Sequence, residues 1–341
     1  MRLLIRADAS GSIGTGHVLR CMALGQALVA MGDSVVMVCC EIPNGLAERV
    51  RGEEIDVIEI EGEPGSKQDL DKTLTIAKGW ADAVLLDGYK FDLHFQRAWR
   101  RRRYRLAVID DYAHSDGYSA HILINQNLHA KEMMYPDARV DEMLLGPKYA
   151  LLRREFWDQK ERKVSVKTRR VLVTLGGADP DNVTAKVIAG LKAVTLDGVE
   201  ARVLVGASNP HLASLRKMAG AKGTTVDVLE AVTDMRAQYD WADIAIAGGG
   251  STTWELAFMG VPSIVIILAE NQDLIAKSVW RAGIGRLLGW HEKVSEMDIA
   301  HAVRDLLSSS ETRDQMSRWG QEIVDGQGAV RVADALREIA K

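Results

Sequence analysis

An apolar run, a glycine-rich loop and an amphipathic helix open the sequence, and this junction most constrains how the chain can fold. Residues Leu3–Ala7 are typical of a buried strand, and Gly14 and Gly16 lie in the loop before a helix that opens on His17. Junctions of this kind occur in parallel α/β sheets, which bind ligands at the carboxyl ends of their strands. The loop predicts an anion or nucleotide site, and His17 adds a side chain suited to proton transfer near neutral pH.

The same alternation of apolar and amphipathic segments runs through both halves of the 341 residues. Strands are expected at 2–7, 34–40, 55–60, 83–87, 105–109 and 121–124, and again at 170–175, 201–205, 225–229, 243–247 and 263–268, with helices between them. We therefore expect an α/β fold of two Rossmann-like, doubly wound parallel-sheet domains. The expected domains are 1–155 and 156–341, with the option that the last helix packs back on the first domain.

The bulk composition excludes several classes of protein. The net charge of −4 argues against a nucleic-acid partner, because such proteins need a basic surface. Three cysteines (Cys21, Cys39 and Cys40) without a CxxC motif argue against a disulfide framework or a zinc site and favour a reducing, cytoplasmic location. The longest apolar stretch, 261–269, is too short to span a bilayer, so no membrane insertion is expected.

His17 has two interpretations, a packed structural histidine or a general base. Its place at a helix N-terminus favours the neutral imidazole, which accepts a proton. The loop before it lacks the GxxxxGK[ST] pattern, which excludes phosphoryl transfer of the P-loop type. Its glycine spacing is also a poor dinucleotide fingerprint. Glu41 nevertheless imitates the acid that holds an NAD ribose, so an oxidoreductase stays as an alternative.

A second glycine-rich junction lies in the other half of the chain. Gly249 and Gly250 allow the backbone to approach a phosphate, and Ser251 or Thr252 is expected to cap the following helix. Glu255 lies one turn into that helix, where its carboxylate is suited to ribose hydroxyls. The alternative interpretation is a tight turn with a capping serine and a glutamate that stabilises the helix dipole.

Other polar residues are expected at the same ligand-binding edges. Tyr89 follows the strand 83–87, and Asn271 and Gln272 begin the helix after the strand 263–268. Asn271 is a reasonable N-cap, and amide pairs also suit sugar hydroxyls and acetamido groups. The pair Asp110 and Asp111 is interpreted as a loop-start carboxylate pair. The histidines other than His17 show no metal-ligand spacing, and no metal site is predicted.

Taken together, these segments resemble the PseG-type sugar-nucleotide hydrolases. The resemblance covers most of the chain and is carried by Arg6-Ala7-Asp8, Gly14-Thr15-Gly16-His17-Val18-Leu19-Arg20-Cys21-Met22-Ala23-Leu24, Leu86-Asp87-Gly88-Tyr89, Ile109-Asp110-Asp111, Asn125-Gln126-Asn127, Gly146-Pro147-Lys148-Tyr149-Ala150-Leu151-Leu152-Arg153, Ala247-Gly248-Gly249-Gly250-Ser251-Thr252-Thr253-Trp254-Glu255, Gly260-Val261-Pro262-Ser263 and Asn271-Gln272. Members of this family convert UDP-2,4-diacetamido-2,4,6-trideoxy-β-L-altropyranose to the free sugar and UDP, in pseudaminic acid biosynthesis.

The resemblance implies a GT-B fold with a nucleotide-sugar cleft between the two domains, similar to the UDP-GlcNAc transferase of peptidoglycan synthesis. It implies that the loop Gly248–Ser251 holds the pyrophosphate, Glu255 the ribose and the main chain near Val232 the uracil. The family's catalytic histidine corresponds to His17, which would activate water for an inverting attack without a metal or other cofactor.

Two other functions stay open at this point. One is a GT-B glycosyltransferase that uses a UDP-sugar and an unknown acceptor. The other is a non-catalytic module that binds nucleotide sugars. The sequence leaves open the oligomeric state and the residue that orients His17.

Overall fold

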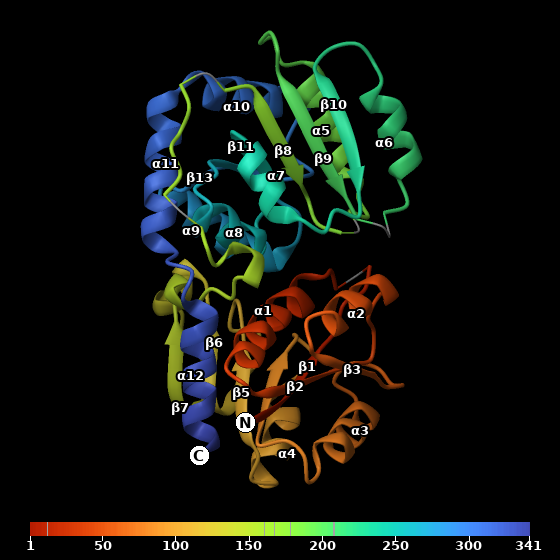
Figure 1. The fold of residues 1–341 in the computed structure, drawn as a ribbon, viewed down its shortest axis with the longest axis vertical. Coiled ribbons are helices and arrows are strands. Elements are labelled where there is room, and N and C mark those ends of the chain that lie inside the picture. The colour runs from red at the N-terminus through yellow and green to blue at the C-terminus, as the bar shows by residue number, and fades with distance from the viewer. Residues whose placement is uncertain (12, 160, 167, 178, 207–208) are drawn as a thin grey trace. The chain divides into compact units, whose positions relative to one another are not determined.

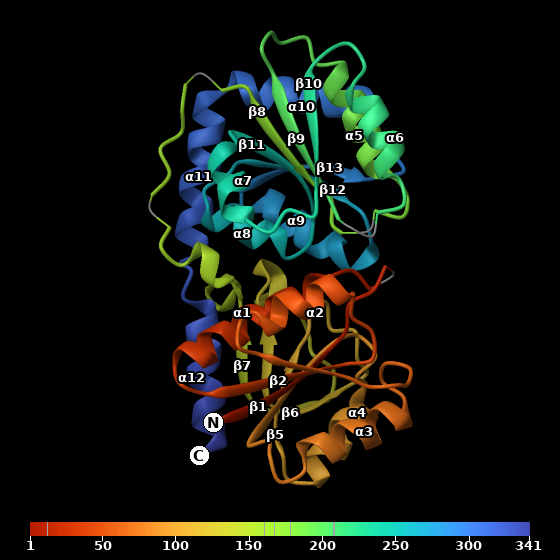
Figure 2. The same ribbon diagram turned by 45° about the vertical axis from the view of Figure 1, so that its right-hand side comes forward.

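The computed structural model describes residues 1–341 except 12, 160, 167, 178, 207 and 208, so Ser12 of the predicted loop lies outside the described residues. The chain forms two compact units. Unit 1 comprises Met1–Arg154 together with Gly326–Lys341, and unit 2 comprises Glu155–Asp325. Each unit contains a parallel sheet covered by helices on both faces, as Figures 1 and 2 show, and this confirms the predicted α/β architecture.

Unit 1 contains a seven-stranded parallel sheet in the order β3-β2-β1-β4-β5-β6-β7. Its strands are β1 (Arg2–Ala7), β2 (Ser34–Cys39), β3 (Asp56–Glu59), β4 (Ala83–Asp87), β5 (Arg105–Ile109), β6 (Tyr118–Asn125) and β7 (Ala138–Leu145). Its helices are α1 (Gly16–Ala30), α2 (Asn44–Arg51), α3 (Lys67–Ala77), α4 (Leu93–Arg101) and α12 (Gly328–Ala340), with short 3-10 turns η1 (Leu128–Glu132) and η2 (Pro147–Tyr149).

The apolar faces of the unit 1 helices explain how the sheet is enclosed. Leu70 and Leu74 of α3 and Trp99 of α4 share one buried cluster with the strands, which places both helices on one face. The helix α1 packs against β1, β2 and α12. Gly328, at the start of α12, lies so close to the backbone of Ala150 that a Cβ there would meet the Ala150 oxygen at 2.2 Å. The helix α12 is therefore an integral part of unit 1.

Unit 2 contains a six-stranded parallel sheet in the order β10-β9-β8-β11-β12-β13. Its strands are β8 (Arg170–Thr174), β9 (Glu200–Val205), β10 (Thr225–Glu230), β11 (Ile244–Gly248), β12 (Ser263–Ile267) and β13 (Gly285–Trp290). Its helices are α5 (Val183–Lys192), α6 (Leu212–Ala219), α7 (Met235–Trp241), α8 (Thr252–Phe258), α9 (Asp273–Arg281), α10 (Glu296–Ser308) and α11 (Ser310–Ile323), with 3-10 turns η3 (Arg154–Phe156) and η4 (Glu270–Gln272).

Two strands were not expected from the sequence, and both lie at sheet edges. In the strand β7, half of the residues are exposed and only one is buried, so its sequence lacks the continuous apolar run of a central parallel strand. The strand β13 is mostly half-buried, and it contains Gly285 and Gly289. Charged residues in β7 and glycines in β13 interrupt the apolar run, so the hydrophobic pattern that found the other strands was too weak here.

In both sheets the first strand of the unit lies inside the sheet. The next two strands extend the sheet on one side of it, and the later strands extend it on the other side. In unit 1 this switch point lies between β1 and β4, whose last residues Ala7 and Asp87 are paired. In unit 2 it lies between β8 and β11, where Thr174 pairs with Ala247. Ligands of open α/β sheets bind outside the carboxyl ends of the strands at such a point. We therefore expect a ligand site at the switch point of each sheet.

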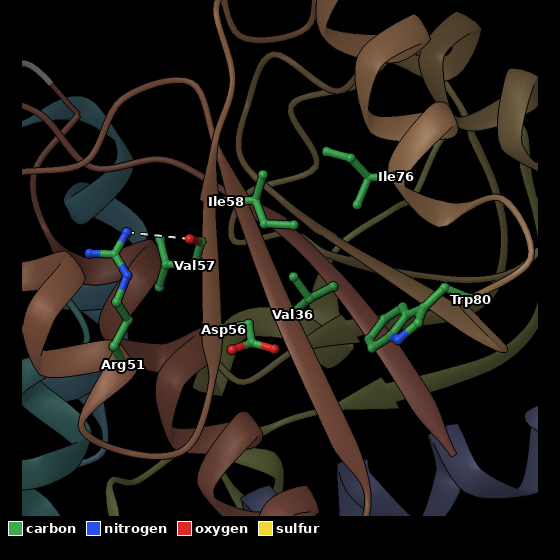
Figure 3. A pocket seen from close by; sticks show the side chains of 7 residues that line it. All are labelled: Val36, Arg51, Asp56, Val57, Ile58, Ile76 and Trp80. Atoms are coloured by element: carbon green, nitrogen blue, oxygen red, sulfur yellow. Dashed lines mark hydrogen bonds between the residues drawn. The ribbon is translucent and has the colours of Figure 1, made fainter.

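A surface pocket of about 440 Å³ lies elsewhere in unit 1, beside the edge strand β3. As Figure 3 shows, it is lined by apolar side chains and two exposed charged ones: Val36, Arg51, Asp56, Val57, Ile58, Ile76 and Trp80. Arg51 is held by a hydrogen bond from its Nη2 to the carbonyl oxygen of Val57. No residue singled out from the sequence lines this pocket. Among the helices of the described chain, none combines the length and the hydropathy that crossing a bilayer requires.

Candidate functional site

The loop after β1 delivers His17 to the switch point of unit 1. Gly14 adopts a φ of +80°, a conformation that favours glycine, and its N–H donates to the carbonyl oxygen of Ser10 at 2.8 Å. The tight turn brings the chain back into α1, in which His17 is the second residue. Gly16 is the first residue of this helix, and Thr15 occupies the N-cap position without a side-chain hydrogen bond.

His17 contacts a buried carboxylate. Its Nδ1 lies 2.6 Å from Oδ1 of Asp87, the last residue of β4, and the imidazole is only 6% exposed. A carboxylate accepts and does not donate, so Nδ1 carries the proton that Asp87 accepts. This leaves the lone pair on Nε2, which makes no hydrogen bond to any residue that the structure describes. The contact fixes the tautomer in which Nε2 is able to accept a proton.

Arg20, one turn after His17 on α1, binds the same carboxylate from the other side. Its Nη2 donates to Oδ1 of Asp87 and its Nε donates to Oδ2, both at 2.7 Å. The Arg20 Nη2 and the His17 Nδ1 lie 3.2 Å apart because both donate to one oxygen. The two-pronged contact is the geometry that arginine forms best with a carboxylate, and it keeps Asp87 from rotating away from His17.

The charges of this cluster determine its protonation. Burial acts to raise the pKa of Asp87, but the positive charge of Arg20 and the contact with His17 outweigh it and hold that pKa well below the usual value. Burial likewise acts to lower the pKa of Arg20, but Asp111 and Asp87 raise it well above normal. Asp87 is therefore an anion at neutral pH. This charge lets Asp87 accept the proton of His17 Nδ1 and thereby orient the imidazole, a contact that the helix N-terminus alone did not predict.

Asp111 completes the cluster, and this is more than the loop-start role expected of it. Its Oδ1 accepts from Arg20 Nη1 at 2.8 Å and from Asn127 Nδ2 at 2.9 Å, and its Oδ2 accepts from the Tyr89 hydroxyl at 2.8 Å. Burial acts to raise the pKa of Asp111, but Arg20 lowers it to about 2. The loop-start interpretation fits Asp110, which accepts from the backbone N–H groups of the two residues after Asp111.

Tyr89 follows β4 as expected, and its ring lies against His17, a contact that was not predicted. The two rings meet edge to face with their centroids 4.9 Å apart. Tyr112 and His114 contact Tyr89 in turn, at 4.9 and 5.2 Å between centroids. Of the residues selected from the sequence, the structure thus brings together His17 and Tyr89. It adds Arg20, Asp87 and Asp111, which were not selected.

The glycine loop of unit 2 follows β11 directly. A Cβ at Gly249 would lie 3.0 Å from the carbonyl oxygen of Gln272, which explains why this position is glycine. Nothing lies within 4 Å of the corresponding point at Gly250. Ser251 occupies the N-cap position of α8, but neither it nor Thr252 caps the helix with its side chain, which corrects the expectation. Neither the Ser251 hydroxyl nor the Thr252 hydroxyl makes a hydrogen bond within the described part of the chain.

Gln272 lies in η4, which follows the neighbouring strand β12, and its side chain supports this loop. Its Oε1 accepts from the backbone N–H of Gly249 at 3.0 Å and from that of Leu268 at 3.1 Å. One of the loop N–H groups expected to face a phosphate is thus already satisfied within the protein. Asn271 is not the helix N-cap that was expected, because α9 begins at Asp273 with Gln272 at the N-cap position. Asn271 lies in η4 instead.

Glu255 and Val232 occupy separate elements of unit 2. Glu255 lies in the first turn of α8, half-buried, and its Oε2 accepts from the Tyr239 hydroxyl at 2.7 Å. Val232 lies between β10 and α7, directly after Ala231, which has a φ of +50°. The main chain of Val232 makes no hydrogen bond to other described residues. In the described chain, no group of three or more His, Cys, Asp or Glu side chains is arranged to hold a metal ion.

Comparison with known proteins shows a similarity to glycosyltransferases. Residues 170–327 match the family "Glycosyltransferase family 28 C-terminal domain". The crystal structure of MurG from Acinetobacter baumannii superposes with a TM-score of 0.67 at 16% identity, covering 99% of both chains. The chain has a GT-B fold. The GT-B fold predicted from the sequence is thereby confirmed.

Two relatives are similar in sequence to parts of this GT-B chain. The spore coat polysaccharide biosynthesis protein SpsG of Bacillus subtilis is 28% identical over 195 residues, which are 57% of this chain and 58% of SpsG. The UDP-N-acetylglucosamine–N-acetylmuramyl-(pentapeptide) pyrophosphoryl-undecaprenol N-acetylglucosamine transferase of Pseudomonas paraeruginosa is 30% identical over 115 residues, 32% of either chain. The chain thus matches little more than half the length of SpsG and about a third of the transferase.

Proposed function

We propose that this protein hydrolyses a UDP-sugar at the anomeric carbon, with His17 as the general base. The observation that carries the proposal is the hydrogen bond of 2.6 Å between His17 Nδ1 and the Asp87 carboxylate. It fixes the tautomer that presents a proton-accepting Nε2. The carboxylate also stabilises the imidazolium that forms when Nε2 takes a proton, as an oriented acid does in other hydrolases.

In this reaction water supplies the oxygen atom that bonds to the anomeric carbon. The bond between that carbon and the diphosphate oxygen breaks, and UDP leaves with the electron pair. The proton of water passes to His17 Nε2. Direct attack inverts the configuration at the anomeric carbon. Backbone N–H groups and hydroxyls such as those of Ser251 and Thr252 are suited to the charge that develops on the departing diphosphate, so we expect release of UDP to continue in EDTA.

The nucleotide assignment rests on unit 2. The family match covers this unit, and the similar transferase from Pseudomonas paraeruginosa is named for a UDP-sugar. We assign the loop Gly248–Ser251 to the pyrophosphate, Glu255 to the ribose and the main chain at Val232 to the uracil. Gln272 serves this loop through its bond to Gly249. The sugar we propose is UDP-2,4-diacetamido-2,4,6-trideoxy-β-L-altropyranose, on the resemblance of the sequence to the PseG-type hydrolases.

The test is incubation of the purified protein with this UDP-sugar and with UDP-GlcNAc, without any acceptor, followed by NMR spectroscopy of the products. We expect UDP and a free sugar, with the initial product inverted at the anomeric carbon, from the diacetamido sugar only. Release of UDP only after an acceptor is added would establish a glycosyltransferase instead, in keeping with the name of the Pseudomonas paraeruginosa relative. Binding without release would establish a non-catalytic module.

A further inference from the structure

Tyr239 of α7 has no role in the reaction outlined above, yet it is hydrogen-bonded to Glu255, a residue of the proposed nucleotide site. Its side chain is completely buried, and its hydroxyl donates to Oε2 of Glu255 at 2.7 Å. Its ring stacks on Phe156 of η3, with 5.7 Å between centroids and 24° between planes. A buried phenol of this kind holds its hydroxyl at a fixed place in the fold.

The backbone of Tyr239 is fixed as well. Its carbonyl oxygen accepts from Arg162 Nη1 at 2.9 Å, and α7 is capped at its start by the Asp234 carboxylate, which accepts from Ala237 N–H at 2.9 Å. Val232 lies only two residues before this cap. The helix α7 therefore follows the segment assigned to the uracil and carries the residue that holds Glu255.

The effect of this support on Glu255 follows from the chemistry of carboxylates. A free glutamate side chain populates several rotamers, and a ligand that needs one of them must order it. The bond from Tyr239 selects one orientation before any ligand arrives. An ionised carboxylate accepts up to about four hydrogen bonds, so the phenol leaves acceptor capacity for hydroxyls of a ligand.

We propose that Tyr239 is a positioning residue that makes the nucleotide site selective for ribose, by holding the Glu255 carboxylate in the orientation that accepts from the ribose hydroxyls. This inference rests on the proposed function, specifically on the assignment of Glu255 to the ribose. It adds a residue whose hydroxyl acts through its hydrogen bond to Glu255. Removing that hydroxyl must therefore weaken binding of nucleotides that have ribose hydroxyls and leave the others unaffected.

The experiment is titration calorimetry of the whole protein with UDP and with 2′,3′-dideoxy-UDP. We expect the wild type to prefer UDP. In Tyr239→Phe we expect UDP to bind roughly 3- to 10-fold more weakly, since one bond to a charged group is lost, while dideoxy-UDP binds as before. With Glu255→Ala as background, Tyr239→Phe should change neither affinity, because a positioning residue has no effect once its target is gone.

The matched control is Tyr118→Phe. Tyr118 is also completely buried, and its hydroxyl donates to Oδ2 of Asp110 at 2.7 Å, but this pair lies in unit 1. The same atom is removed from the same kind of bond to a carboxylate, together with a hydrogen bond of 3.3 Å that it accepts from Ser115 N–H. We expect a similar loss of thermal stability and no change in the affinity for either nucleotide. The comparison separates a general weakening of the fold from the effect on ribose selectivity.

The outcomes separate this inference from the proposed function. Equal weakening of both nucleotides by Tyr239→Phe, or no weakening of UDP, overturns the inference alone. A wild type that binds no UDP overturns both. If Tyr239→Phe does not fold, Phe156→Leu keeps the hydroxyl but removes the stacked ring, and a loss confined to UDP is then expected. Equal affinities of that variant and the wild type for UDP contradict the inference.

Discussion

The switch points of the two units lie in sheets of the same strand order but differ in what the chain places there. In unit 1, three charged residues and a histidine are buried and bonded to one another: Arg20, Asp87, Asp111 and His17. In unit 2, the same place holds consecutive glycines and the hydroxyls of Ser251 and Thr252. A buried, hydrogen-bonded charge cluster fixes proton positions, whereas a glycine loop gives a ligand access to the backbone. One fold thus provides a site suited to proton transfer and a site suited to anion binding.

The substitution His17→Ala tests this difference between the units with the largest expected effect. If unit 1 supplies the base, hydrolysis of the UDP-sugar falls by about 10²–10⁴-fold, because that is the usual contribution of a general base. Affinity for UDP stays the same, since the nucleotide is assigned to unit 2. Both quantities are measurable, by UDP release and by calorimetry. An unchanged turnover would remove His17 from the reaction.

Asp87→Asn and Asp111→Asn form a matched pair. Either change takes a carboxylate from Arg20 and should lower stability by a similar amount, about 3 kcal/mol, because a buried ion pair is broken. Only Asp87 contacts His17. We expect turnover to fall by on the order of 10²-fold in the first variant and by less than about 10-fold in the second. Steady-state kinetics of both proteins, at a temperature where both are folded, checks this.

The pH dependence of stability is a further test, because the buried charge cluster of Arg20, Asp87 and Asp111 belongs to unit 1. The pKa of Asp111 is lowered to about 2, so its ionised form is stabilised by folding. This stabilisation is complete above about pH 4, the ordinary aspartate range, and is lost as pH falls toward 2. The difference in unfolding free energy between the wild type and Asp111→Asn should therefore shrink by about 2 kcal/mol over this window. Urea unfolding followed at several pH values measures it; a constant difference would contradict the lowered pKa.

Two alanine substitutions test unit 2 with the smallest expected effects. Gly250→Ala meets no atom within 4 Å and should leave the melting temperature unchanged. If a phosphate approaches this backbone, the methyl group weakens UDP binding by about 10-fold. Gly249→Ala brings a Cβ to 3.0 Å from the Gln272 backbone and should lower stability as well. Equal UDP affinity in Gly250→Ala and the wild type would argue against the loop as the diphosphate site.

The repeating architecture and His17 were predictable because their signals are local. Each central strand is a short apolar run, and the glycine loop directly precedes His17 in the sequence. The strands β7 and β13 were missed because charged residues in the first and glycines in the second interrupt such a run. The expectation that a side chain of Ser251 or Thr252 caps α8 was wrong, since the backbone at Gly250 and Ser251 accepts the first helical hydrogen bonds there.

The partners of His17 could not be predicted from the residues next to it in the sequence. Asp87 is 70 residues away, and only the strand order that pairs β4 with β1 brings it to His17. Arg20 carried a usable signal, because a residue three positions along a helix shares the face of the first. A strand-order argument applied to the end of β4 would have selected Asp87 with it. The contact of Tyr239 with Glu255 joins two helices and has no such signal.

Unit 1 is interrupted in the sequence by the whole of unit 2, since its final segment is Gly326–Lys341. A ribosome releases the contiguous domain in full before it delivers the helix that the interrupted domain still lacks. Folding during synthesis therefore completes the nucleotide-assigned half first, although the histidine-bearing half is translated earlier. Premature termination after the contiguous domain would leave α1 without its neighbour α12, and so would expose apolar surface on the half that was made first.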